Sequence, residues 1–219
     1  MANSLYVFDM DETLINADCA MLWHEFLVEK NIISSPDFLE EDKRLMRLYA
    51  KGELDMQAYL TFSIHPIRHL STEQVAQLAD QCVEEKILPK LFPQAKVLLE
   101  ELQQQQRTLL IISASVTFLV AAVAKRIGIK HAIGIDLIEK EGQFTAVILG
   151  TPSYQQGKVT RLQQWCASHN LTFSVLHFYT DSINDLPLCQ YADFAYLVNP
   201  CKQLAKHGVK HHWPVLNWG

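Results

Sequence analysis

Long hydrophobic runs and an excess of basic residues are both missing from this 219-residue sequence. No apolar run is long enough to cross a bilayer, and no signal-peptide pattern precedes the first strand pattern, so we expect a cytoplasmic protein with no membrane partner. Nineteen Lys and Arg stand against 24 Asp and Glu, which gives a formal net charge of -5. A nucleic-acid partner is therefore not expected, because such a partner favours a basic surface.

Cysteine is also sparse, with five residues, an odd number, and no CxxC pair. Free thiols in a reducing compartment are the simplest expectation, since neither a disulfide framework nor a cysteine metal site fits this spacing. Three histidines near the C-terminus, His207, His211 and His212, do not match a zinc signature either. We expect them to have a surface or packing role, most of them on a short edge strand.

What the sequence does contain is a change of pattern along the chain. Residues 5–9 form a short apolar strand pattern, and from about residue 18 to residue 86 apolar residues recur at helical spacing without a strand signal. Between residues 90 and 200, strand and helix patterns alternate, which is typical of a parallel α/β sheet.

These patterns predict a doubly wound parallel-sheet α/β core, formed by residues 1–16 and 88–219. Residues 17–87 would be an all-helical cap inserted after the first strand, a natural lid over a site. The hydrophobic content of 49% is sufficient for a full core in a chain of this length. The sequence indicates neither an internal repeat nor the oligomeric state.

Polar side chains stand where several predicted strands end. Asp9 ends the first strand and Asp11 follows it, Ser113 ends an apolar strand, and Asp181 ends another with Asp185 four residues on. Ligands of open parallel sheets bind outside the carboxyl ends of the strands, so these groups can converge at one edge. So many carboxylates repel one another unless a cation joins them.

Two cations can balance this cluster. Lys158 follows Gly157 at the start of a predicted helix, between the second and third of these strands. The oxygen-only ligand set favours a hard divalent ion, Mg²⁺, over zinc. Carboxylates, a lysine, a hydroxyl and Mg²⁺ together suit phosphoryl transfer, in which a nucleophile and a proton donor act while cations stabilise the phosphoryl oxygens.

Four segments resemble the motifs of the haloacid dehalogenase-like (HAD) superfamily, in the same order and over residues 5–200. "VFDMDETL" is similar to the first motif, DxDxT, and "LLIISAS" to the second. Lys158 in "QQGKVTRL" fits the third motif, and "YTDSINDLPL" fits the fourth. The helical insertion resembles the C1 cap of the phosphoserine-phosphatase-like subfamily. One motif alone would be weak, but four in order are a specific signal.

The resemblance implies roles for the first three motifs. Asp9 would be the nucleophile that forms an aspartyl-phosphate, and Asp11 would be the general acid and then the base for the hydrolytic water. Ser113 and Lys158 would bind the phosphoryl oxygens. Asp11 also argues against dehalogenase chemistry, because a halide leaving group needs no proton.

The resemblance also implies a Mg²⁺ site. Asp9, the main-chain carbonyl of Asp11 and Asp181 would hold the ion, with Asp185 positioned through water or behind these ligands. Without the resemblance, Asp181 and Asp185 would equally suit a helix cap and a first-turn acid.

Simpler roles remain open for the other residues. Ser113 could be a plain helix cap, and Ser115 fits a cap better than a ligand. A lone Lys158 would ordinarily be a surface lysine, and Lys125 or Lys140 could take its place, although both lie at less suitable positions.

The predicted function is a Mg²⁺-dependent phosphomonoester hydrolase that acts on a small soluble phosphorylated metabolite through an aspartyl-phosphate. One alternative is a phosphotransferase on the same fold, which would pass the phosphoryl group to a hydroxyl other than water. The other is a non-catalytic phosphate-binding or protein-interaction module, which the joint presence of all motif residues disfavours.

The cap suggests the kind of substrate. Asp18 lies where phosphoserine phosphatases hold a glutamate that binds the substrate ammonium, while their carboxylate-binding arginine falls near Ser63, with Arg68 the nearest guanidinium. We therefore expect phosphoserine to be a poor substrate, because a carboxylate without a cationic partner is rejected. A phosphomonoester with an amine but no carboxylate, such as histidinol phosphate or phosphocholine, should do better. The alternative is that Asp18 merely caps the first cap helix.

Overall fold

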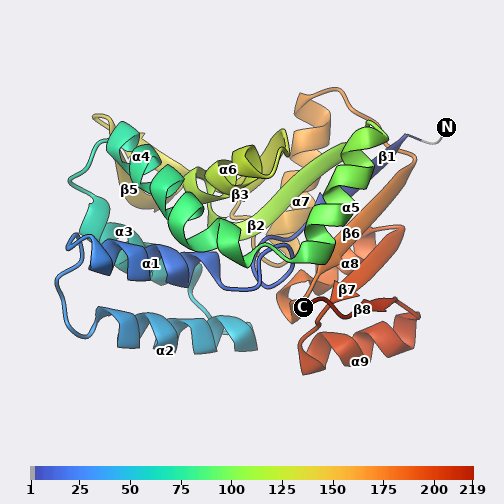
Figure 1. Ribbon diagram of the computed structural model, residues 1–219, viewed down its shortest axis with the longest axis horizontal. Helices are drawn as coiled ribbons and strands as arrows, with labels where there is room; N and C mark the ends of the chain where they lie inside the picture. The colour runs from blue at the N-terminus through green and yellow to red at the C-terminus, as the bar shows by residue number, and fades with distance from the viewer. Residues whose placement is uncertain (1–2) are drawn as a thin grey trace.

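The computed structural model describes residues 3–219 and shows a parallel sheet with helices on both faces (Figure 1). Its six strands lie in the order β3-β2-β1-β6-β7-β8, and all neighbouring pairs are parallel. The strands are β1 (Ser4–Phe8), β2 (Thr108–Val116), β3 (His131–Ile135), β6 (Val175–Thr180), β7 (Phe194–Val198) and β8 (Val215–Leu216). The predicted α/β fold is confirmed.

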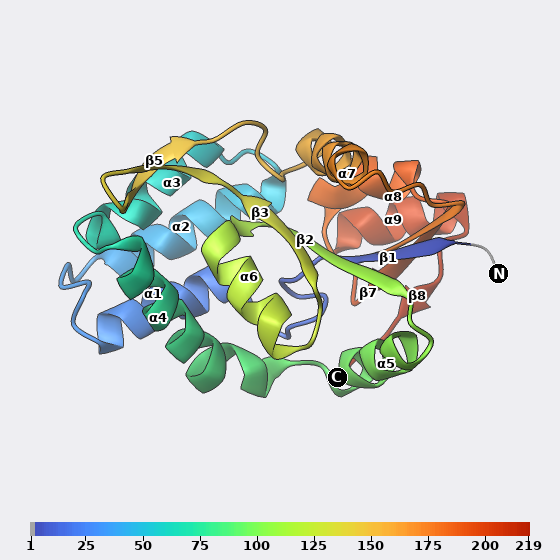
Figure 2. The same cartoon turned by 90° about the horizontal axis from the view of Figure 1, so that it is seen from above.

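Helices cover the two faces of the sheet in separate groups (Figure 2). One face carries α5 (Pro93–Gln104) and α6 (Thr117–Arg126), and the other carries α7 (Gln156–Ser168), α8 (Leu186–Tyr191) and α9 (Lys202–His211). Side chains along β1 point alternately to the two faces of the sheet. Leu5 and Val7 pack on the side of α7, α8 and α9, and Phe8 packs on the side of α5 and α6. The sheet is therefore buried on both sides, as parallel sheets are.

Four helices lie between β1 and α5 in the chain and gather at one end of the sheet (Figure 1). They are α1 (Cys19–Glu29), α2 (Phe38–Lys51), α3 (Met56–Ile64) and α4 (Thr72–Cys82). Short 3₁₀ and π turns follow α3 and α4, at His65–Ile67, Val83–Ile87 and Leu88–Lys90. These helices are the inserted segment that the sequence predicts, and its limits at residues 17 and 87 stay a prediction.

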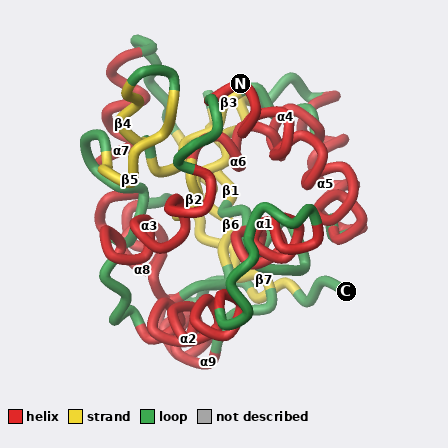
Figure 3. The backbone as a smooth tube through the Cα atoms, turned by 90° about the vertical axis from the view of Figure 1, so that its left-hand side faces the viewer, coloured by secondary structure: helices red, strands yellow, loops and turns green. Residues whose placement is uncertain are grey.

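A two-stranded hairpin, β4 (Leu137–Lys140) and β5 (Gln143–Ile148), leaves the core and packs on α3 (Figure 3). The side-chain nitrogen Nε2 of Gln57 on α3 donates a hydrogen bond of 2.7 Å to the carbonyl of Ala146. The helical cap is thus tied to the core by a second chain segment in addition to its own two connections.

Two local expectations are wrong. Strand β2 does not end at Ser113 but continues to Val116, with an irregular register against β3 between Ile112 and Val116. The histidines of the tail lie on and just after helix α9, not on an edge strand, because the amphipathic pattern of that segment continues to His211. None of the described helices is long and apolar enough to span a membrane.

Gly157, in the first turn of α7, lies against the main chain of Pro152, and a substitution there tests whether this close approach is required. A Cβ atom there would overlap the carbonyl oxygen of Pro152, which is main chain and cannot move aside. We expect Gly157→Ala to lower the free energy of unfolding by about 1–3 kcal/mol, the usual cost of overpacking, measured by urea denaturation. Gly208→Ala in α9 is the matched control, since a Cβ there meets only the end of the Leu197 side chain. A smaller loss for Gly157→Ala than for the control would contradict the prediction.

Candidate active site

Asp9 is placed at the carboxyl edge of the sheet by the strand pairing. Its main-chain N–H donates to the carbonyl of Tyr179 at 2.9 Å, so the residue is held beside β6 immediately after β1 ends. The chain then turns sharply, and the N–H groups of Leu14 and Ile15 both donate to the carbonyl of Met10. Asp9 is therefore fixed and almost fully buried, with 5% of its surface exposed.

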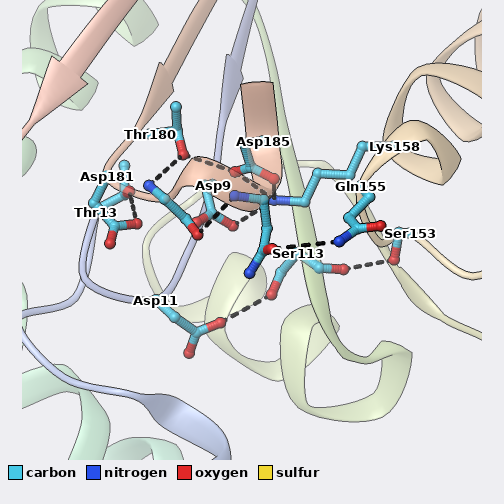
Figure 4. Close-up of polar contacts among 12 residues, drawn as sticks. Asp9, Asp11, Thr13, Ser113, Ser153, Gln155, Lys158, Thr180, Asp181 and Asp185 are labelled. Atoms are coloured by element: carbon cyan, nitrogen blue, oxygen red, sulfur yellow. Dashed lines mark hydrogen bonds and ion pairs between the residues drawn. The ribbon is translucent and has the colours of Figure 1, made fainter. Parts of the chain in front are cut away.

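Lys158 joins the carboxylates that come from distant parts of the chain (Figure 4). Its Nζ lies 2.8 Å from Oδ1 of Asp9 and 2.7 Å from Oδ1 of Asp185. Thr180 Oγ1 donates to the other oxygen of Asp185 at 2.7 Å. The lysine is only 1% exposed, so its charge is balanced inside the protein and not by water.

The carboxylates outweigh this lysine. Burial raises the pKa of Asp9 from 3.8 to about 7, Lys158 opposes the rise, and the charges of Asp185 and Asp11 add to it. Burial, followed by the charges of Asp9 and Asp185, also raises the pKa of Asp181. Burial would lower the pKa of Lys158, but the same carboxylates raise it instead. A further positive charge at the site would therefore be electrostatically favourable.

The donor set suits Mg²⁺. The carboxylates of Asp9 and Asp181 are available at this edge, and Thr13 Oγ1 orients Asp181 with a 3.3 Å hydrogen bond to its Oδ1. Over residues 3–219, no group of three or more His, Cys, Asp and Glu side chains is spaced to hold a metal ion. Mg²⁺ commonly takes one or two carboxylates and completes its shell with water and substrate phosphate, which fits the two acids found here.

The carboxylate of Asp11 turns away from Asp181 and towards the cap and β2. Its Oδ2 accepts hydrogen bonds from Ser113 Oγ at 2.9 Å and Ser115 Oγ at 3.2 Å, and its Oδ1 accepts from the N–H of Cys19 at 2.7 Å. Ser115 therefore binds Asp11 and is not the cap of α6, whose N-cap position is occupied by Val116.

Ser113 lies inside β2 at its irregular register and is fully buried. Its carbonyl accepts a 2.5 Å hydrogen bond from Ser153 Oγ, and its own Oγ accepts from the N–H of Ser115 at 3.0 Å. It is not a helix cap. Ser153 is a supporting residue that sequence reasoning missed, because nothing in its neighbourhood marks it as near β2.

A pocket between the cap and the sheet opens beside Asp11. It is lined by Asp11, Asp18, Ala20, Trp23, Met46, Tyr49, Leu54, Met56, Tyr59, Leu60, Ser63, Ala114, Ser115, Val116 and Leu119. Two of these side chains are acids and none is Lys, Arg or His. The pocket is therefore apolar on its walls and negative in charge.

Asp18 caps a helix and also faces the pocket, so its capping role does not exclude substrate binding. It is the N-cap of α1, with Oδ1 accepting from the N–H of Met21 at 2.9 Å, and it also lines the pocket. Burial, followed by the charge of Asp11, raises the pKa of Asp18 to about 7. An ammonium group placed beside it would relieve this unfavourable charge.

Arg68 does not reach this pocket. It is exposed and lines a separate cleft with His65, Lys140 and Glu141, beyond the end of α3. The 3₁₀ turn after α3 carries Arg68, the guanidinium nearest in sequence to the place of the carboxylate-binding arginine, away from Asp18, so its role as a substrate residue stays a prediction. Lys140 lies in the same separate cleft, and Lys125 pairs with Asp80 on the surface, so neither replaces Lys158.

The comparisons with known proteins identify the family. The family model of the haloacid dehalogenase-like hydrolases matches residues 6–190. The chain belongs to this family. It is 34% identical to histidinol-phosphatase of Neisseria meningitidis serogroup C, over 98% of this chain and 99% of that protein. It is also 23% identical to a probable phosphatase of Mycobacterium tuberculosis, over 99% of this chain and 76% of that protein.

Solved structures agree with this assignment. A crystal structure of a protein of unknown function from Bordetella pertussis Tohama I has a TM-score of 0.90 and 28% identity, covering 99% of both chains. A phospho-aspartyl intermediate analogue of phosphoserine phosphatase has a TM-score of 0.68 and 18% identity, covering 98% of this chain and 93% of the other. The predicted superfamily and the predicted phosphatase class are confirmed.

Asp9→Asn tests the excess negative charge of the site. A carboxyl group whose pKa is raised on folding destabilises the folded protein as pH rises from its ordinary value of 3.8 towards about 7. Asparagine cannot ionise. In EDTA at about pH 8, the free energy of unfolding of the variant should therefore exceed that of the wild type by on the order of 1–3 kcal/mol. The gain should shrink at about pH 5, where the wild-type carboxyl is mostly protonated.

Urea denaturation at the two pH values, with and without Mg²⁺, measures this effect. Added Mg²⁺ should stabilise the wild type more than the variant, because the ion offsets the charge that the variant has lost. A variant less stable than the wild type in EDTA at both pH values would show that Asp9 is balanced by Lys158 alone.

Proposed function

We propose that the protein is a Mg²⁺-dependent phosphomonoester hydrolase for small metabolites that carry an amine and no carboxylate, with histidinol phosphate as the leading candidate. The observation that carries the proposal is the pocket beside Asp11, which is lined by two acids and no basic side chain. An ammonium group would be attracted there, whereas a carboxylate would be repelled and left without a partner.

Asp9 is the nucleophile in this proposal. One of its carboxylate oxygens attacks phosphorus, the bond from phosphorus to the ester oxygen breaks, and an aspartyl-phosphate forms. Lys158, 2.8 Å from Asp9, holds the carboxylate in place and offsets charge on the phosphoryl oxygens. Ser113 exchanges its hydrogen bond to Asp11 for one to a phosphoryl oxygen, which also releases Asp11.

Asp11 protonates the leaving alkoxide and then removes a proton from the water that hydrolyses the aspartyl-phosphate. Its contacts support this role, since Ser115 and the N–H of Cys19 still hold its two oxygens between the phosphate site and the pocket after Ser113 turns to the phosphoryl group. A general acid must lie within hydrogen-bonding reach of the leaving oxygen, and a place between these two regions favours Asp11 for that role.

Asp9, the main-chain carbonyl of Asp11 and Asp181 would hold Mg²⁺, with Asp185 acting through water or through Lys158. When bound, the ion neutralises and polarises the phosphoryl oxygens. The family membership and the two acids at this edge support the assignment.

Asp18 binds the substrate ammonium in this proposal. Support comes from its place in the pocket and from the relative in Neisseria meningitidis, a histidinol-phosphatase that matches nearly the whole chain. Histidinol phosphate is an amino-alcohol phosphate with no carboxylate, as the charge of the pocket requires.

Metal dependence is the first test. EDTA should abolish hydrolysis of p-nitrophenyl phosphate, and Mg²⁺ should restore it. Ca²⁺ should restore little activity, because it takes six to eight ligands and would draw both Asp9 oxygens away from in-line attack. Full activity in EDTA would rule out the metal assignment.

Asp11→Asn should lower kcat/KM for alkyl phosphates more than for p-nitrophenyl phosphate. General acid catalysis contributes about 10²–10⁴-fold for a poor leaving group, whereas nitrophenolate leaves with little help. The comparison is the loss of kcat/KM on phosphoethanolamine against that on p-nitrophenyl phosphate. Equal losses on the two substrates would argue against proton donation, and Asp9→Asn, which removes the nucleophile, is the control that should abolish both.

The substrate is tested by kcat/KM on phosphoserine, histidinol phosphate and phosphocholine. Phosphoserine should be the poorest, and Asp18→Asn should lower kcat/KM for the amine phosphates about tenfold or more relative to p-nitrophenyl phosphate, because the attraction between the carboxylate and the substrate ammonium is lost. Asp55→Asn is the matched control, since Asp55 caps α3 in the same way but lines no part of the pocket. If phosphoserine is the best substrate, the amine-only proposal fails.

A further inference from the structure

A chain of three buried polar side chains crosses the cap and takes no part in the reaction described above. His24 on α1 lies with its Nδ1 2.8 Å from Oδ2 of Asp42 on α2, and its Nε2 lies 2.8 Å from Oγ of Ser63 on α3. Their exposed fractions are 0%, 1% and 6%. Of the three, only Ser63 lines the pocket.

The histidine fixes the Ser63 hydroxyl. Nδ1 of His24 lies at contact distance from Asp42 although neither group makes a hydrogen bond of regular geometry there, and Nε2 is the ring atom that faces Ser63. If Nε2 accepts the Ser63 hydrogen, Ser63 keeps acceptor capacity for a group in the pocket, and if Nε2 donates, Ser63 keeps its O–H as well.

Tyr59 supplies a second hydroxyl at the same place. It lies one helical turn before Ser63 on α3, lines the pocket and is 6% exposed. Its hydroxyl is buried beside Ser63, but this contact is poorly formed, and within residues 3–219 the hydroxyl makes no hydrogen bond of regular geometry. A buried hydroxyl without a partner costs free energy, so a ligand that satisfies it gains affinity.

We propose that Ser63 and Tyr59 form a subsite for a neutral nitrogen heterocycle of the imidazole class on the substrate. His24 and Asp42 are its positioning residues. The inference rests on the proposed function and names the group that the far end of the pocket selects. A neutral imidazole has one donor and one acceptor nitrogen, which two hydroxyls can satisfy together.

The walls of the pocket agree with a flat ring. Trp23, Met46, Leu54, Met56, Leu60 and Leu119 line it. Such walls favour the faces of an aromatic ring over a second charged group. In the proposed function, Asp11 faces the phosphate group and Asp18 faces the amine. The end of the pocket with the Ser63 and Tyr59 hydroxyls is therefore left for an uncharged polar group.

The test compares histidinol phosphate with phosphoethanolamine, which has the same phosphate and amine but no ring. Tyr59→Phe and Ser63→Ala should each lower kcat/KM for histidinol phosphate about tenfold, the effect of losing one buried hydrogen bond, and leave phosphoethanolamine unchanged. Tyr191→Phe and Thr61→Ala are matched controls at exposed positions outside the pocket and should change neither substrate.

Two further measurements separate substrate binding from a structural role. Tyr59→Phe should not lower Tm, because its hydroxyl makes no hydrogen bond of regular geometry within residues 3–219. Asp42→Asn should lower the ratio of the two kcat/KM values in the wild-type background but not in the Ser63→Ala background, because it acts only through Ser63. A role confined to cap stability would alter both substrates alike in either background.

The outcomes distinguish this inference from the proposed function. If the wild type prefers histidinol phosphate and Tyr59→Phe and Ser63→Ala leave that preference intact, the subsite is wrong and the proposed function stands. If the wild type hydrolyses both amines without preference, the heterocycle subsite is again wrong. Turnover of neither amine would overturn both. Should Ser63→Ala fail to fold, Tyr59→Phe decides alone.

Discussion

The active site depends on one buried lysine. Lys158 brings together Asp9, which follows β1, and Asp185, which precedes α8, with Nζ to oxygen distances of 2.8 and 2.7 Å. A buried ion pair contributes little net stability because desolvation offsets the attraction, yet removing one partner leaves a costly unpaired charge. The arrangement is therefore better explained by chemistry than by stability. Lys158 opposes the rise in the pKa of Asp9 and fixes the direction of its carboxylate in a strongly negative site.

The same reasoning about charge extends from the phosphate site to the cap. Asp11 and Asp18 both lie along the pocket, and burial together with the charge of Asp11 raises the pKa of Asp18 to about 7. The phosphate end has a lysine and room for a divalent cation, whereas the pocket has no basic side chain at all. A substrate that is negative at one end and positive near it matches this distribution. In the proposed function, selectivity would depend on where the site lacks positive charge as much as on where it has it.

Much of the fold and of the phosphate site could be predicted from the sequence, because each motif is local. Asp9, Asp181 and Lys158 stand at strand ends or a helix start, and the edge of a parallel sheet brings such positions together. The extension of β2 past Ser113 could not be predicted, since its register depends on pairing with β3.

The contacts of the cap residues were harder to predict, because they too depend on packing between segments that are distant in sequence. Arg68 is carried to another cleft by a 3₁₀ turn, while the contact of His24 with Asp42 and Ser63 joins three helices whose relative packing no local pattern specifies.

Asp11 shows how closely the core and the cap are linked. One oxygen binds Ser113 of the core and the other binds the N–H of Cys19, the first residue of the cap helix α1. The orientation of Asp11, the proposed proton donor, is therefore set jointly by the core and the cap, and a shift of α1 would move Asp11 as well as Asp18.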